Sequence, residues 1–360
     1  MSREAKTKVV DAQAKVNLFL RVLGLRPDGY HELETLILPV SLADRLEVHA
    51  DSDPSFRTLS FSLDVTGKDE LVRGVPRDET NLVVRAGMAL AERAGVRGFA
   101  DVSLEKRIPS SAGLGGGSSD AAAALVALNE LWACGLDAEA LRDLGASVGS
   151  DVPALMAGGP ALARGRGERV ERAPVGPLSL ALVTFPFGVS TPDAFRWWDE
   201  AGGPTGPDPA ALLESAHHQG EGFGASLFND LEGPVIRRHP EIGETKRALL
   251  EGGALGALMT GSGPTAFGVL AGPGARLDPS AERKIEAVAG RPPTYVTTRG
   301  STVWGSLAPR DSNADFRDQN PASCLLDEGP VAISGHDTAD PVPLTPLRPD
   351  VAIDGSRRYK

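Results

Sequence analysis

Apolar and polar residues alternate along the first part of the chain with the two-residue period of β-strands. Residues 8–23 predict one such strand, and the same period at 42–50 and 57–65 predicts two more. The first strand divides its side chains into one face with Val16, Leu18 and Leu20 and a second face with Lys15, Asn17 and Phe19. Lys15 and Asn17 are therefore expected to project together from a β-rich amino-terminal part of the chain.

Apolar residues then recur every three or four positions, the period of amphipathic helices. This pattern predicts three helices, over residues 78–95, 120–132 and 137–149. For the first of them we expect Asp78 or Thr80 as the N-cap and Gly95 as the residue that ends the helix. The amino-terminal half of the chain therefore combines predicted strands with predicted helices.

A glycine-rich loop at residues 109–119 joins a strand predicted at 99–108 to the helix that follows, which is expected to begin near Ser118. Glycines let backbone amides approach an anion closely, and a helix N-terminus adds free N–H groups and a positive dipole end. We expect the loop to bind phosphate, the alternative being an ordinary loop with Ser118 as helix cap. Walker A is excluded because Gly117 is followed by serines and no lysine, and the dinucleotide fingerprint lacks its third glycine.

In the second half of the chain the stretches of regular apolar spacing are shorter. Residues 179–188 resemble a short buried strand, and residues 240–272 predict a helix, a glycine-rich turn and a strand. From about residue 301 the periodicity is lost among many Pro and Asp residues. We expect residues 301–360 to be a largely disordered tail, with a docking or regulatory role left open.

Composition limits the classes of function. With 360 residues the chain is long enough for two domains. A net charge of −11 and a pI near 5.1 argue against broad contact with nucleic acid or an anionic membrane, so any anion needs a local site. Two cysteines and the lack of an apolar signal sequence favour a reducing compartment, and the cytoplasm is expected.

Five ordered segments resemble the GHMP kinases, named for galactose, homoserine, mevalonate and phosphomevalonate. The segments are residues 12–20, 27–35, 109–124, 149–153 and 259–267. The resemblance implies a two-domain α+β fold: a ribosomal protein S5 domain 2-like ATP-binding domain at 1–165 and a ferredoxin-like α/β domain at 166–300. The tail at 301–360 has no counterpart in the family, and residues 199–224 are hard to align with it.

Within the family the motifs are most similar to members that use ATP to phosphorylate the 2-hydroxyl of a cytidyl-diphospho-methylerythritol in the non-mevalonate isoprenoid route. The resemblance implies that Asp151 is the base for that hydroxyl and that Lys15 stabilises the charge of the transferred group. From spacing alone, Asp151 is more readily interpreted as a loop or cap carboxylate and Lys15 as a solvated lysine of an edge strand. Their joint occurrence in matched motifs favours the catalytic interpretation.

The resemblance also assigns binding residues. The phosphates of ATP are expected to contact the loop and first helical turn, at Gly113, Gly115, Gly116, Gly117, Ser118 and Ser119. Asn81 and Lys106 would line the adenosine side, unless they are only a helix cap and a surface strand residue. Mg²⁺ is expected with ATP, held mainly by phosphates and water, with Ser119 as a candidate ligand and Asp120 as a candidate partner behind it.

For the substrate, the resemblance implies that Tyr30 and Phe195 sandwich the cytosine and that His31 reads its edge. The alternatives are a turn tyrosine and a core phenylalanine. Further contacts are assigned to Asn17 and Thr191, for the sugar or diphosphate, and to Gly261 and Gly263 in a turn that closes over the site.

Three functions therefore compete. The Tyr-His pair at residues 30–31 favours a cytosine-containing substrate over that of a homoserine or mevalonate kinase. A nucleotide-binding regulator without catalysis is expected to lack Lys15 or Asp151, and both are present. The expected partner is the small-molecule substrate, the expected assembly a monomer or homodimer.

Overall fold

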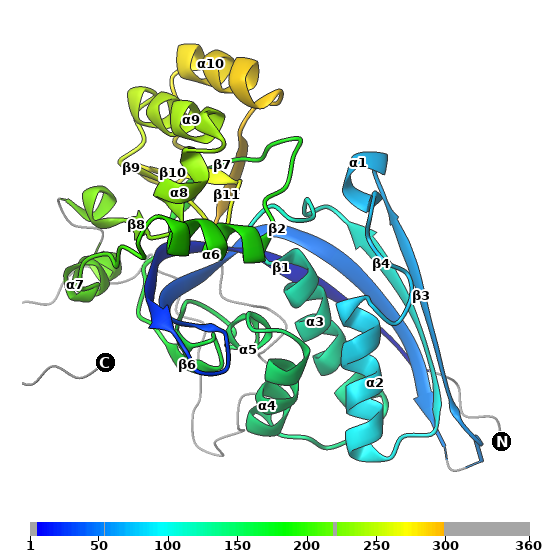
Figure 1. The fold of residues 1–360 in the computed structure, drawn as a ribbon. Coiled ribbons are helices and arrows are strands. Elements are labelled where there is room, and N and C mark those ends of the chain that lie inside the picture. The colour runs from blue at the N-terminus through cyan, green and yellow to red at the C-terminus, as the bar shows by residue number, and fades with distance from the viewer. Residues whose placement is uncertain (1–5, 54, 219–221, 299–360) are drawn as a thin grey trace, which may run out of the picture. The chain divides into compact units, whose positions relative to one another are not determined.

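The computed structural model describes residues 6–53, 55–218 and 222–298 (Figure 1). The tail predicted at 301–360 lies outside the described residues. None of the helices in the described ranges combines the length and the apolar character needed to cross a membrane.

The larger sheet is built on two long antiparallel strands, β1 (Lys6–Leu25) and β2 (His31–Ser52). The strand predicted at 8–23 is confirmed as β1, whereas the one predicted at 42–50 is only the second half of β2. Among the described residues the sheet has the order β3-β4-β2-β1-β8, with β5 and β6 added beside β2. These other strands are β3 (Leu59–Gly67), β4 (Gly98–Lys106), β5 (Ala161–Gly165), β6 (Arg169–Arg172) and β8 (Phe228–Asn229).

Helices cover one face of this sheet, as the alternating apolar positions of β2 and β4 require (Figure 1). They are α2 (Leu82–Ala94), α3 (Gly116–Leu131), α4 (Ala138–Val148) and the short α5 (Val152–Leu155). The predicted N-cap of α2 is wrong: Asp78 bonds Thr80, and the N-cap is Asn81, whose side chain accepts a hydrogen bond from Val83 N. Gly95 is confirmed as the residue that ends the helix, with a left-handed backbone. Helix α3 begins at Gly116, two residues earlier than predicted, so Ser118 is not its cap.

A smaller antiparallel sheet has the order β11-β7-β10-β9, with α9 (Pro240–Glu251) and α10 (Pro279–Ala289) packed beside it. Its strands are β7 (Ser179–Val183), β9 (Gly256–Met259), β10 (Ala266–Leu270) and β11 (Thr294–Thr297). The prediction for 240–272 missed β9, so the glycine-rich turn joins two strands and not a helix to a strand. The chain also forms α1 (Asp69–Val72), α6 (Thr191–Glu200), α7 (Ala210–His218), the 3₁₀ turn η1 (Phe223–Ser226) and α8 (Glu232–Ile236).

The two sheets share an apolar cluster in which side chains of β1 and β2, such as Val16 and Leu36, join those of β7 and β10, such as Leu180 and Phe267. The middle of β1 is consequently buried on both faces, between α3 and this cluster. Residues beyond 166 also supply β6 and β8 to the larger sheet. The segment that carries Lys15 therefore lies where both sheets and the glycine-rich loop meet.

Candidate active site

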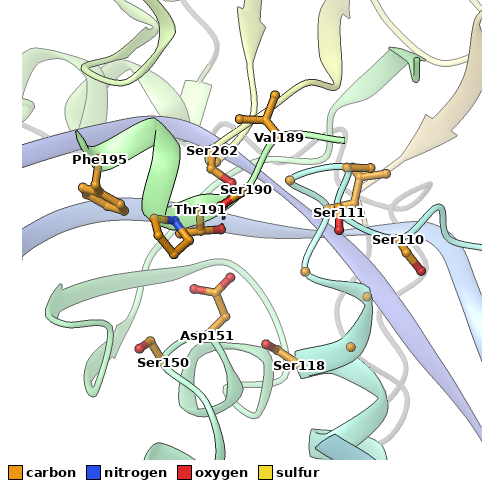
Figure 2. A pocket seen from close by; sticks show the side chains of 18 of the residues that line it. Ser110, Ser111, Ser118, Ser150, Asp151, Val189, Ser190, Thr191, Phe195 and Ser262 are labelled. Carbon is orange, nitrogen blue, oxygen red and sulfur yellow. Dashed lines mark hydrogen bonds between the residues drawn. The ribbon is translucent and has the colours of Figure 1, made fainter. Parts of the chain in front are cut away.

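A cavity of about 890 Å³ opens between β1, the glycine-rich loop, the residues before α5 and the start of α6. Figure 2 shows Ser118 and Asp151 on one side of it and Thr191, Phe195 and Ser262 on the other. Its volume lies within the range of pockets that bind small organic ligands. The cavity lining contains all but two of the site residues predicted from the sequence, the exceptions being Ser119 and Gly263.

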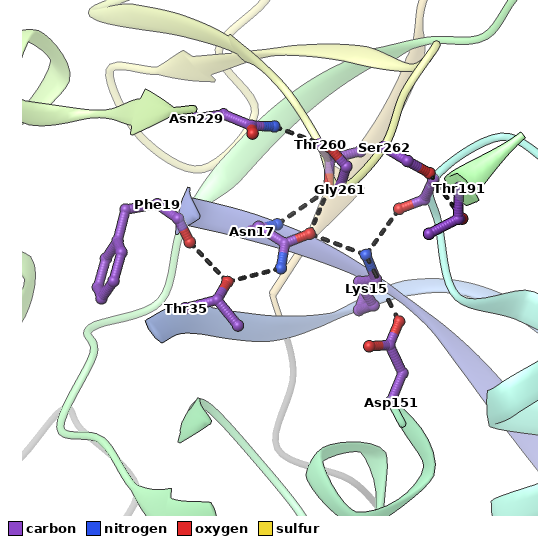
Figure 3. Close-up of polar contacts among 11 residues, drawn as sticks. Lys15, Asn17, Phe19, Thr35, Asp151, Thr191, Asn229, Thr260, Gly261 and Ser262 are labelled. Carbon is purple, nitrogen blue, oxygen red and sulfur yellow. Dashed lines mark hydrogen bonds and ion pairs between the residues drawn. The ribbon is translucent and has the colours of Figure 1, made fainter. Parts of the chain in front are cut away.

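Lys15 lines this cavity and is 4% exposed, and its ammonium group faces Asn17 and Asp151 (Figure 3). Its Nζ donates to Asn17 Oδ1 and to the carbonyl of Gly113, each at 2.8 Å, and lies 3.9 Å from Asp151 Oδ2. Burial lowers the pKa of Lys15, and the Asp151 carboxylate partly offsets this effect. The structure thus brings together two groups that lie far apart in the sequence.

Asp151 stands at the N-terminus of α5, but its side chain makes no capping hydrogen bond there. The side chain is 40% exposed and points toward the cavity (Figure 2). A carboxylate that is open to a ligand can accept a proton from a hydroxyl placed beside it. The alternative of a capping carboxylate is not what the geometry shows.

Asn17 is 2% exposed, and both ends of its side-chain amide bond protein groups. Besides accepting from Lys15, Oδ1 accepts from Thr260 Oγ1 at 3.0 Å, and Nδ2 donates to Thr35 Oγ1 at 2.8 Å. Thr260 Oγ1 also accepts from the Asn17 backbone N at 2.9 Å. Asn17 therefore holds Lys15 in place, and the sequence analysis missed both threonines.

The glycine-rich loop passes directly beside Lys15. Gly115 is the N-cap of α3 and has a left-handed backbone, with φ of 69°. A Cβ at this position would lie 3.0 Å from Lys15 Cγ, so only glycine allows the loop and the lysine to approach so closely. The first turn of α3 then presents the backbone N–H groups of Gly116, Gly117 and Ser118 at the cavity. This arrangement suits a bound phosphate.

The Ser119 hydroxyl is buried and donates to Gln13 O at 2.7 Å, so it points away from the position expected of a metal ligand. Among the described residues, no group of three or more His, Cys, Asp and Glu side chains could hold a metal ion. The described residues therefore do not form a protein cage for Mg²⁺.

A buried charge cluster lies behind the loop. Lys106 Nζ donates to Asp44 Oδ2 and, at 2.8 Å, to Asp120 Oδ2. Asp44 is completely buried and also accepts the backbone N–H groups of Arg107 and Ile108. Burial raises the pKa of Asp120 to about 8, against the opposing effect of Lys106. Burial acts to lower the pKa of Lys106, but Asp120 and Asp44 together raise it.

Aromatic side chains gather at the far end of the cavity. Tyr30 is 53% exposed, and His31 stacks on Phe195 with ring centroids 4.7 Å apart. His31 Nε2 lies 3.1 Å from Asp199 Oδ1, a neighbour that the sequence analysis missed. Phe195 also packs against the apolar cluster of the smaller sheet, so its core role and its place in the cavity coexist.

The remaining predicted residues lie around the cavity. Asn81 lines it although it caps α2, and Thr191 Oγ1 lies 3.0 Å from Ser262 Oγ. Gly261 lines the cavity as part of the turn between β9 and β10, whereas Gly263 does not. The side chain of Asn229, also missed by the sequence analysis, holds this turn by donating to Met259 O and Gly261 O at 2.8 Å each.

Comparison with known proteins identifies the family to which the chain belongs. Residues 81–159 match the family model "GHMP kinases N terminal domain" and residues 210–289 match "GHMP kinases C terminal". The chain belongs to the GHMP kinase family. A homoserine kinase structure from Cytophaga hutchinsonii has the same fold, with a TM-score of 0.60 at 18% identity over 84% of this chain and 97% of that one.

Within the family, several similar curated proteins carry the same name. The 4-diphosphocytidyl-2-C-methyl-D-erythritol kinase of Pelotomaculum thermopropionicum is 48% identical over 72% of this chain and 88% of its own length. The enzyme of the same name from Symbiobacterium thermophilum is 42% identical over 72% and 90%. A crystal structure of 4-(cytidine 5'-diphospho)-2C-methyl-D-erythritol kinase aligns with a TM-score of 0.64 and 37% identity over 82% of this chain and all of that chain.

Proposed function

We propose that this chain uses ATP to phosphorylate the 2-hydroxyl of 4-diphosphocytidyl-2-C-methyl-D-erythritol, a step of non-mevalonate isoprenoid biosynthesis. The observation that supports the proposal best is the pairing of buried Lys15 with Asp151 beside a glycine-rich helix start. The curated relatives that bear the name of this kinase support the choice of substrate. We further propose that the enzyme acts in the cytoplasm as a monomer or homodimer.

The chemistry follows from the positions of the two charged groups. Asp151 is open to the cavity and accepts the proton of the attacking hydroxyl. Lys15, fixed by Asn17 and the Gly113 carbonyl, places a positive charge where negative charge develops on the transferred group. Since burial disfavours the charged form of Lys15, Asp151 also helps to keep the lysine protonated.

The nucleotide occupies the side of the cavity that is built from the glycine-rich loop, with its phosphates on the first turn of α3. Asn81 and Lys106 line the adenosine side. ATP supplies the phosphoryl group, and we propose that Mg²⁺ enters with its phosphates. The cation is then held mainly by phosphate oxygens and water, because Ser119 and Asp120 are already engaged by Gln13 and Lys106.

The substrate lies across the remainder of the cavity, with its base at the aromatic end. Tyr30 and Phe195 provide flat apolar surfaces for a cytosine, and His31 provides Nδ1, the ring nitrogen that does not contact Asp199, for its polar edge. A homoserine or mevalonate substrate has no base to use this end. The alternative of a non-catalytic nucleotide-binding regulator does not explain why a buried lysine is kept beside an open carboxylate.

The test is phosphorylation of a panel of alcohols, including the cytidyl substrate, homoserine and mevalonate, with products identified by mass spectrometry. We expect phosphate on the cytidyl substrate only. Asp151→Asn is expected to lower kcat by at least about 100-fold while the KM for ATP changes little. The matched control is Asp143→Asn, an exposed carboxylate on α4. Near-normal turnover by folded Asp151→Asn would remove the aspartate from the base role.

A further inference from the structure

The hairpin between β5 and β6 carries an arginine at its tip, Arg166, between Gly165 and Gly167. Gly167 has φ of +117°, and a Cβ on it would lie 2.5 Å from the carbonyl oxygen of Ser150. The tip of the hairpin is therefore packed directly on the residue before Asp151.

The other side of the hairpin faces the aromatic end of the cavity. Gly165 is paired with Leu33 on β2, two residues from His31. The Arg166 guanidinium lies over the ring of Tyr30, 4.8 Å from its centroid. Arg166 thus lines the cavity on a hairpin that contacts Ser150, beside Asp151, and Tyr30, at the aromatic end.

Arg166 differs from the other cations of the cavity in its lack of a carboxylate ion-pair partner among the described residues. Lys15 has Asp151 as an ion-pair partner, Lys106 has Asp44, and Arg196 has Asp193 and Glu200. Arg166 makes no ion pair with a carboxylate of the described residues. Its charge acts on the Asp28 carboxylate, whose pKa is lowered mainly by the Tyr30 backbone N–H and also by Arg166, but no short ion pair within the described residues occupies the guanidinium, so the group is open to a ligand.

We infer that Arg166 binds the diphosphate of the cytidyl substrate, an inference that rests on the proposed function. If the cytosine lies at Tyr30 and the alcohol at Asp151, the diphosphate that joins them must span the distance between, where Arg166 lies. A planar guanidinium donates two parallel hydrogen bonds to phosphate oxygens, which fixes the position of the group as well as its charge. The cavity also contains the carboxylates of Asp151 and Asp199, which would repel a diphosphate without such a cation.

The test compares two competitive inhibitors, CDP, which carries the diphosphate, and cytidine, which does not. For Arg166→Gln we expect the inhibition constant of CDP to rise about 10- to 100-fold, the effect of losing charged hydrogen bonds. The constant for cytidine should change less than about 2-fold. Arg166→Lys, which keeps the charge but loses the bidentate geometry, should fall between Arg166→Gln and the wild type. The matched control is Arg172→Gln, an exposed arginine at the far end of β6, which should not differ from the wild type.

Two results would overturn the inference alone. If Arg166→Gln weakens CDP and cytidine equally, the arginine only supports the ring of Tyr30. If neither constant changes, the side chain does not touch the substrate. The wild-type enzyme is assayed for phosphorylation of the cytidyl substrate in the same experiment. A wild type that neither phosphorylates it nor binds CDP would overturn the proposed function and this inference together.

Discussion

The buried carboxyl of Asp120 gives the most quantitative prediction. Its pKa is raised from 3.8 to about 8 in the native state. Between these two values the native protein binds a proton that the unfolded chain does not bind. The free energy of unfolding must therefore fall as the pH rises through this window, by about 1.4 kcal/mol per pH unit from this group.

Asp120→Asn removes that dependence, because the amide is neutral at every pH and has nearly the shape of the protonated acid. The variant should thus gain stability relative to the wild type as the pH rises. From pH 5.5 to 7.5 the gain should reach about 3 kcal/mol, the slope multiplied by two pH units. Lys106 does not contribute in this window, since its pKa is raised from 10.5.

The assay is urea unfolding followed by circular dichroism at several pH values for the wild type and Asp120→Asn. Asp143→Asn serves as control, because Asp143 is an exposed carboxylate whose replacement should leave the pH dependence unchanged. If the difference in unfolding free energy between the wild type and Asp120→Asn stays constant across the range, Asp120 is ionised throughout and the reasoning fails.

Three further predictions concern the cavity. Gly115→Ala should destabilise the fold by about 1–2 kcal/mol in urea unfolding, because φ is 69° and the new Cβ would meet Lys15. The control is Gly117→Ala, where the nearest atom to the new Cβ would be 3.6 Å away; an equal loss of stability in this variant would contradict the reasoning. The kcat of the wild type should fall on the alkaline side at a pH below 10.5, because burial lowers the pKa of Lys15 and its deprotonation removes the charge; a profile that is flat up to pH 10.5 would argue against the role of the ammonium. Asp199→Ala should lower kcat/KM for the cytidyl substrate about 5- to 10-fold without changing the KM for ATP, because it removes the carboxylate beside His31. An unchanged kcat/KM would show that this contact does not position the histidine.

Local patterns allowed much of the fold to be predicted from the sequence. Alternation located β1, and helical spacing located α2, α3 and α4, because these segments bury one face or one stripe. The strand β9 was missed because it is four residues long and follows a helix, where its apolar residues continue the helical pattern. The start of α3 was misplaced because Gly115 caps it through its backbone conformation, without a capping side chain.

The buried charge cluster was predictable in part. In β4 every second residue is buried, and Lys106 occupies the buried position that follows Leu104. In β2, Asp44 occupies the buried position that precedes Leu46. Two opposite charges in phase with the core faces of neighbouring strands indicate a buried pair. By contrast, Thr260 and Thr35 gave no local signal. Their role depends on contacts with Asn17 across long sequence separations, which only the folded chain establishes.

The bonds between Asn17 and Thr260 connect the larger sheet to the β9–β10 turn of the smaller one, and Asn229 adds two more bonds to that turn. A motion that parted the sheets here would break a buried hydrogen-bond network and displace Lys15. We therefore expect Lys15 to stay in place. Ligands would enter through displacements at the periphery of the cavity, where Tyr30 is exposed. Such an enzyme would admit and release its ligands while the groups that perform phosphoryl transfer remain assembled.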